Sequence, residues 1–179
     1  MTTIGISLEI PEPYGTELRS RRASYGDPQA EFVPTHVTLL PPTEVDPEAL
    51  PEIGEHLAKV AQATAPFRMR LGGTGTFLPT SPVVFVQIAR GLTQCVALES
   101  KVRDGVLDRE LQFPYHPHVT VAHDLDEPRL EFAMRDLAGY RAEFDLDRLK
   151  LYEQCPSGGW RVLREFPFEA DDDEDRPAG

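Results

Sequence analysis

The tripeptide His-Val-Thr occurs twice in this chain of 179 residues, at 36–38 and at 118–120. Each copy lies in a β-branched segment typical of a strand. About ten residues after each His, an Asp-Pro-Glu or Asp-Glu-Pro sequence begins an amphipathic helical pattern. Both halves of the chain therefore have the same predicted order of strand, helix, strand with His-Val-Thr, helix and strand. The sequence predicts one structural unit repeated.

The first repeat spans about residues 1–77 and the second about residues 82–168, and the second ends in a predicted hairpin. We expect an α+β fold of two lobes related by a pseudo-twofold axis, each an antiparallel-type sheet with helices packed outside. In each lobe the His-x-Thr strand should line a central cleft. Residues 1–168 are then a single bilobal domain, and residues 169–179 are expected to be a disordered acidic tail.

The two tripeptides have the chemistry of a phosphodiester site. Side chains alternate faces along a strand, so His and Thr project from one side while the central Val points into the core. Two such strands facing each other offer an acid/base pair, His36 and His118, for proton transfer to and from a phosphodiester. Thr38 and Thr120 are expected to bind the non-bridging phosphate oxygens. This scheme needs no metal and no cofactor.

Charge and composition narrow the partners. A net charge of −12 argues against binding to duplex nucleic acid, which depends on many Lys and Arg side chains. A small phosphodiester or an RNA terminus fits this charge better. Two cysteines are too few for a disulfide framework, and the sequence has neither a secretory signal nor a segment that could span a bilayer. We expect a cytoplasmic monomer without a membrane partner.

These motifs resemble those of the 2H phosphoesterase superfamily, in its 2′-5′ RNA ligase-like and cyclic phosphodiesterase branch. The resemblance implies action on 2′,3′-cyclic phosphates, 2′,5′ linkages, ADP-ribose cyclic phosphate or RNA ends, without metal or nucleotide cofactor. It also implies that His36 and His118 are the catalytic pair and that Thr38 and Thr120 bind phosphate. It extends to about Phe168 and includes further segments: Gly73-Thr-Gly-Thr-Phe77, Phe113-Pro-Tyr-His-Pro-His118, Leu149-Lys-Leu-Tyr152 and the strand from Trp160.

One position departs from this pattern. Relatives commonly carry Arg or Lys a few residues after the second motif, where this chain has His123. A neutral imidazole holds phosphate less firmly than a guanidinium does, so His123 is a candidate substrate-binding residue whose effect on substrate or rate stays open.

Other residues have two readings each. Phe77 either stacks on a base or packs in the core, and Tyr115 is a second candidate for substrate binding. Arg19, Arg21 and Arg22 form either a basic rim for the phosphate or a solvated helix face. Tyr152 and Trp160 either pack the closing hairpin or line the cleft.

The sequence predicts no metal site. His116, His118 and His123 have the spacing of a weak metal motif, but Pro117 interrupts it and no acid completes a ligand set.

Three functions remain open. A metal-independent phosphoesterase is the favoured function. A non-catalytic nucleotide or RNA-end binding module with the same pocket is the alternative. RNA end-joining is the third function, and the net negative charge of the chain makes it the least favoured.

Overall fold

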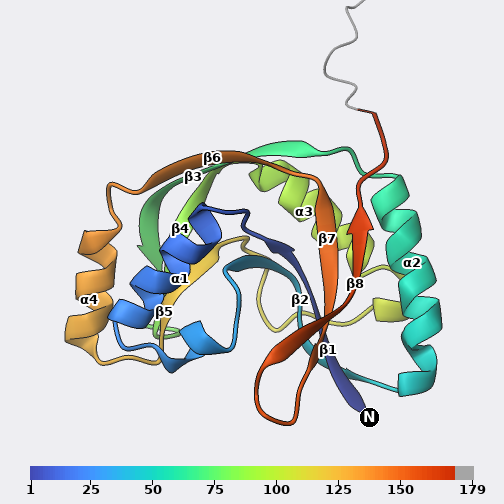
Figure 1. Cartoon of the computed structure of the whole chain (residues 1–179), viewed down its shortest axis with the longest axis horizontal. Helices are drawn as coiled ribbons and strands as arrows, with labels where there is room; N and C mark the ends of the chain where they lie inside the picture. Colours follow the sequence, from blue (N-terminus) through green and yellow to red (C-terminus); the bar gives the residue numbers. More distant parts are fainter. Residues whose placement is uncertain (172–179) are drawn as a thin grey trace, which may run out of the picture.

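The computed structural model describes residues 1–171, which form one curled antiparallel sheet with helices packed around it (Figure 1). The strand order is β6-β3-β4-β5-β2-β1-β7-β8, and every neighbouring pair is antiparallel. The strands are β1 (Thr2–Glu9), β2 (His36–Val45), β3 (Phe67–Thr76), β4 (Val83–Arg90), β5 (Val119–His123), β6 (Arg141–Leu146), β7 (Arg148–Gln154) and β8 (Trp160–Pro167).

Four α-helices gather in two groups at opposite ends of the sheet (Figure 1). One group contacts the strands around β4 and β5 and the other contacts β2 and β8. The first group is α1 (Tyr14–Ser24) and α4 (Glu127–Asp136), and the second is α2 (Leu50–Gln62) and α3 (Leu92–Val102). The two Asp-Pro signals act as caps: Asp126 accepts a hydrogen bond from the Arg129 N–H, and Asp46 caps a short 3₁₀ turn that leads into α2.

The α+β prediction is confirmed, but the two expected sheets are continuous. They join where the His-Val-Thr strands β2 and β5 pair with each other, through the single registered pair Val37–Val119. The halves of the sheet also differ from the sequence repeats. Strand β3, which ends the first repeat, pairs with β4 and β6, whereas β7 from the second repeat pairs with β1. The pseudo-twofold axis stays a prediction.

The expected alternation of side chains holds at both motifs. Val37, Leu39, Val119 and Val121 are at most 1% exposed and belong to the single hydrophobic core, which α2 joins through residues such as Leu57. His36 and Thr38, one position away from these valines, are only half-buried. The hydrophobic effect therefore fixes which face of β2 and β5 is turned into the core, and it leaves the His and Thr side chains on the other face.

The predicted acidic tail falls largely outside the described residues, because residues 172–179 are not among them. Its first part is bound to the domain: the Glu169 N–H donates to the Ala61 carbonyl and the Ala170 N–H to the Thr64 carbonyl. Within residues 1–171, no helix has both the length and the apolar composition that a membrane crossing requires.

Candidate active site

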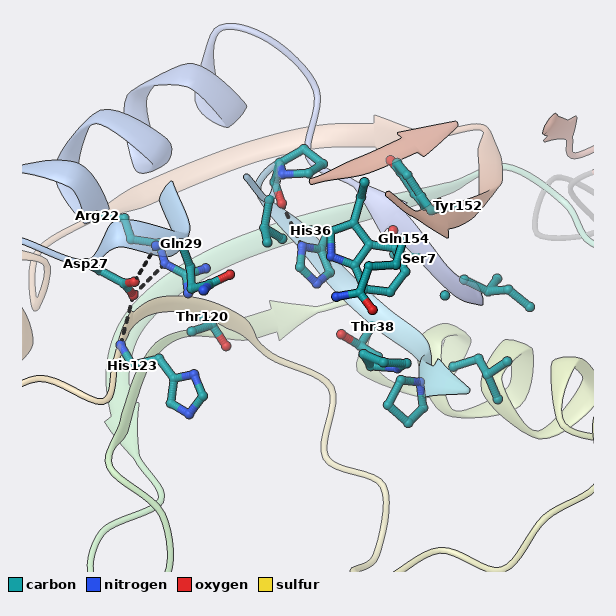
Figure 2. Close-up of a pocket in the computed structure, with 18 of the residues that line it drawn as sticks. Ser7, Arg22, Asp27, Gln29, His36, Thr38, Thr120, His123, Tyr152 and Gln154 are labelled. Carbon is teal, nitrogen blue, oxygen red and sulfur yellow. Dashed lines mark hydrogen bonds and ion pairs between the residues drawn. The ribbon is translucent and has the colours of Figure 1, made fainter. Parts of the chain in front are cut away.

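A cavity of about 510 Å³ opens on the face of the sheet that carries the His and Thr side chains. His36, Thr38 and Thr120 line it together, with His123 at one end (Figure 2). Of the four residues predicted to carry the chemistry, only His118 is not part of this lining. The cavity also takes in side chains from β1, β7, β8 and the segment after α1.

The β2–β5 register explains how the motifs meet. Antiparallel pairing of Val37 with Val119 places His36 across from Thr120 and Thr38 across from His118. Side chains opposite each other in such a pair have Cβ atoms about 4.5–5.5 Å apart. From this register we expect each imidazole to lie beside the hydroxyl of the other motif. Figure 2 shows the Thr38 and Thr120 hydroxyls turned toward each other across the cavity.

The two histidines share one hydrogen-bonding arrangement. His36 Nδ1 lies 2.6 Å from the Pro34 carbonyl, and His118 Nδ1 lies 2.6 Å from the His116 carbonyl. A carbonyl oxygen can only accept, so Nδ1 carries the proton in both rings. In the neutral ring, Nε2 is then the free acceptor, and in the charged ring it is a donor. Both imidazoles are thus oriented to exchange a proton through Nε2.

Both imidazoles also have a lowered pKa. Burial is the main cause, and the nearby carbonyl of Pro34 or His116 opposes it only in part. The charge of Arg22 lowers the pKa of His36 further. Positive charges on His116 and His36 lower the pKa of His118 further.

His118 lies against an aromatic cluster of Phe77, Phe85 and His116. Its ring centroid is 4.9 Å from that of Phe77 and 5.3 Å from that of Phe85. The Phe77 ring meets His116 and His118 edge-on, at interplanar angles of 74° and 88°. Phe77 is therefore placed to fix the orientation of His118. Of its two predicted readings, packing describes its contacts, and stacking on a substrate base stays a prediction.

Tyr115 and His123 occupy different positions. The Tyr115 hydroxyl donates to the Thr38 carbonyl at 2.7 Å, and burial raises its pKa. Tyr115 thus supports the main chain of β2 and does not line the cavity. The His123 ring does line it, with Nε2 3.5 Å from Asp124 Oδ2. Substrate contact by either residue stays a prediction.

The three arginines of α1 separate in the structure. Arg19 donates to the carbonyls of Ala30 and Glu31, and Arg21 pairs with Asp136 at 2.7 Å on the outside. Arg22 alone of the three lines the cavity, and contact of its guanidinium with a phosphate stays a prediction. Tyr152 and Trp160 also line the cavity.

The sequence pattern does not identify Asp27 as a site residue: as part of Gly26-Asp27-Pro28 it predicts only the end of the first helix. Asp27 is 2% exposed, lines the cavity and accepts hydrogen bonds from Arg22, Gln29 and His123. An Asp-Pro pair after a helix is an ordinary stop signal, and nothing in the sequence distinguishes a buried example. Among residues 1–171, no three His, Cys, Asp or Glu side chains cluster as metal ligands.

Comparison with known proteins agrees with this architecture. The family model of the 2′-5′ RNA ligase superfamily matches residues 10–155. A candidate phosphoesterase of Oceanobacillus iheyensis is 29% identical over 169 residues, covering 93% of this chain and 98% of its own. A candidate phosphoesterase of Bacillus mycoides is 28% identical over 142 residues, covering 78% of this chain and 82% of its own.

Solved structures share the fold. LigT of Escherichia coli in complex with NADP+ has a TM-score of 0.66 at 18% identity, covering 94% of this chain and 99% of LigT. TT0787 of Thermus thermophilus has a TM-score of 0.63 at 26% identity, covering 96% of this chain and 100% of that chain. Because the family model covers most of the sequence and includes both His-Val-Thr motifs, this chain belongs to the 2′-5′ RNA ligase superfamily.

Proposed function

We propose that this protein is a metal-independent phosphoesterase that opens 2′,3′-cyclic phosphates or cleaves 2′,5′-linked nucleotide and RNA-end substrates. The observation that carries the proposal is the β2–β5 pairing: His36, Thr38 and Thr120 line one cavity, and His118 precedes the strand paired with β2, with its Nδ1 held by a carbonyl as in His36. Relatives along most of the chain are named as candidate phosphoesterases, and LigT has been crystallised with 3′-AMP. Both observations support a nucleotide phosphodiester as the substrate.

The reaction needs two proton transfers. One histidine of the pair His36 and His118 takes a proton from water through Nε2 as the water oxygen attacks phosphorus. The other histidine donates its Nε2 proton to the ribose oxygen that leaves, so a cyclic phosphodiester becomes a phosphomonoester. Thr38 and Thr120 donate their hydroxyls to the non-bridging oxygens, where charge develops. Both residues line the cavity, so their hydroxyls can reach a phosphate bound there.

Small substrates suit this cavity better than long nucleic acids. Its volume of about 510 Å³ is in the range of small-molecule sites, roughly 300–1,000 Å³. The chain as a whole carries a charge of −12, which repels an extended polyanion. We therefore propose a cyclic nucleotide or an RNA terminus as the substrate. We also propose that the protein is monomeric and cytoplasmic.

The direct test is turnover of the four 2′,3′-cyclic nucleotides by the wild-type protein in the presence of a chelator. We expect hydrolysis to a single phosphomonoester, whose 2′ or 3′ position identifies the leaving oxygen. Loss of activity with chelator, restored by a divalent metal, would contradict the metal-free mechanism. Binding of 3′-AMP without turnover of any phosphodiester would instead favour the non-catalytic binding module.

Acidic pH should favour catalysis, because both histidines have a pKa below the ordinary value of 6.5. The general acid must hold its proton, so kcat/KM should peak below pH 6.5 and fall about tenfold per pH unit above the higher of the two macroscopic pKa values. Bound phosphate stabilises the imidazolium, so the kcat profile should lie at higher pH. Steady-state rates from pH 4.5 to 9 test this. A kcat/KM optimum above pH 6.5 would contradict it.

A further inference from the structure

Arg22 stands out among the residues that line the cavity. It is the only Arg or Lys among those that the described chain contributes to the lining. Its side chain is only 10% exposed, although Arg is seldom buried unless its charge is paired. It comes from the last turn of α1 and enters the cavity at the end where Thr120 and His123 lie (Figure 2).

Asp27 holds this guanidinium in place from one side. The Arg22 Nε donates to Asp27 Oδ2 at 2.7 Å, which fixes the plane of the fork. The carboxylate is otherwise occupied, since Oδ2 also accepts the His123 N–H at 3.0 Å and Oδ1 accepts the Gln29 N–H at 2.9 Å. Asp27 therefore ties Arg22 to the end of β5, three residues after Thr120.

The rest of the guanidinium is uncommitted. Within residues 1–171, neither Nη1 nor Nη2 of Arg22 donates a hydrogen bond to a protein atom, so up to four N–H groups remain. Arg22 lines the same cavity as His36 and Thr120, and its positive charge contributes to the lowered pKa of His36. A planar, permanently charged fork beside Thr120 and His36 has the geometry that carries two hydrogen bonds to a phosphate.

We propose that Arg22, positioned by Asp27, is a substrate-binding residue that holds the non-bridging oxygens of the phosphate through its Nη atoms. The cation of the site thus comes from α1, and not from position 123, where relatives commonly carry Arg or Lys. The His123 main-chain N–H instead anchors Asp27. The inference rests on the proposed function for its substrate class. The ligand that it requires, a nucleoside phosphate, can nevertheless be tested separately from turnover.

Calorimetric binding of 3′-AMP, with adenosine as the phosphate-free comparison, tests this role. Arg22→Gln alone would leave a buried carboxylate unpaired, so the main variant is Arg22→Gln/Asp27→Asn, which replaces the ion pair by two neutral amides. We expect its affinity for 3′-AMP to fall roughly 10- to 100-fold, the range for hydrogen bonds to a charged group, while adenosine binding is unchanged. Arg22→Lys keeps the charge but loses the fork, and we expect an intermediate loss.

Arg21→Gln is the matched control, because it removes a neighbouring guanidinium of the same helix that points outward to Asp136. Its 3′-AMP affinity should equal that of the wild type. In turnover assays, the Arg22 variants should have a higher KM for a cyclic nucleotide. If Arg22 had only a structural role, a higher KM would be accompanied by weaker binding of adenosine. Equal 3′-AMP affinity of wild type and double variant, or equal losses for 3′-AMP and adenosine, would overturn the inference, as would a wild type that binds no 3′-AMP.

The two proposals fail in different ways. Arg22-dependent binding of 3′-AMP by a protein that cleaves no phosphodiester would refute the enzyme and leave the Arg22 assignment standing. Turnover that depends on His36 but is insensitive to Arg22, in kcat/KM and in 3′-AMP affinity, would refute only the Arg22 assignment.

Discussion

Replacement of either His36 or His118 by Ala is expected to lower kcat for cyclic nucleotide opening by roughly two to four orders of magnitude. Each variant removes an imidazole whose Nδ1 is bound to a main-chain carbonyl and whose Nε2 is left for proton transfer. Because the two histidines act on opposite sides of the same phosphorus, the double variant should lose little more than the worse single variant. Quench-flow or coupled assays on both singles and the double provide the measurement.

His56→Ala is the matched control for these variants. His56 lies on α2 and its Nε2 is hydrogen-bonded to the Val102 carbonyl, outside the cavity. The His56→Ala variant should retain the kcat of the wild type. Added imidazole should partly restore the His36→Ala and His118→Ala variants, since it can occupy the space that each ring leaves. A loss of less than tenfold for either variant would remove that histidine from the proton transfers.

The largest expected effect on stability comes from Asp27→Ala. The substitution leaves the Arg22 guanidinium buried without its charge partner, and it also removes the acceptor of the Gln29 and His123 N–H groups. Breaking a buried pair by removing one partner typically costs about 3–5 kcal/mol. We expect the free energy of unfolding to fall by about that amount. Urea denaturation followed by circular dichroism measures this change. The dependence of the unfolding free energy on urea concentration should be the same as in the wild type.

Asp27→Asn and Asp145→Ala are the comparisons for this prediction. Asn retains a carbonyl oxygen for one of the N–H groups, so it should lose less stability than Ala does. Asp145 pairs with Arg68 on the surface, where its side chain is 69% exposed, and its loss should change stability little. An Asp27→Ala protein as stable as the Asp145→Ala protein would show that the buried network does not contribute to folding.

Much of the architecture could be predicted from local sequence, because it depends on short-range periodicity. The alternation of His36, Val37 and Thr38 determines which face of β2 is buried, and that prediction holds for 118–120 as well. The Asp126 cap follows from the preference of side-chain oxygens for the free N–H groups of a helix start. Such features need no knowledge of what lies across the fold.

Long-range partners could not be predicted in the same way. The repeat predicts two lobes, each with its own antiparallel-type sheet, whereas β3 pairs with β4 and β6 of the second repeat. Strand pairing depends on which hydrophobic faces meet after the chain has folded, and period-2 patterns are alike in all strands. Asp27 was missed for a related reason, because its partners Arg22 and His123 come from α1 and β5 and identify it only in three dimensions. Arg22 itself was one of three equivalent arginines until the fold separated them.

The exchange of strands between the two sequence repeats also has a consequence for biosynthesis. Strand β1, near the N-terminus, has β7 as one of its two neighbours, and β7 is about 145 residues further along the chain. At a translation rate of roughly 5–20 residues per second, the nascent chain exposes an unpaired edge of β1 for on the order of 7–30 s. Both His-Val-Thr motifs are synthesised before β6, β7 and β8 exist to complete the sheet. The sheet can be completed only when nearly the whole domain has been synthesised, because β1 pairs with β7 and β3 pairs with β6. We therefore expect the domain to fold as one unit of high contact order, late in translation.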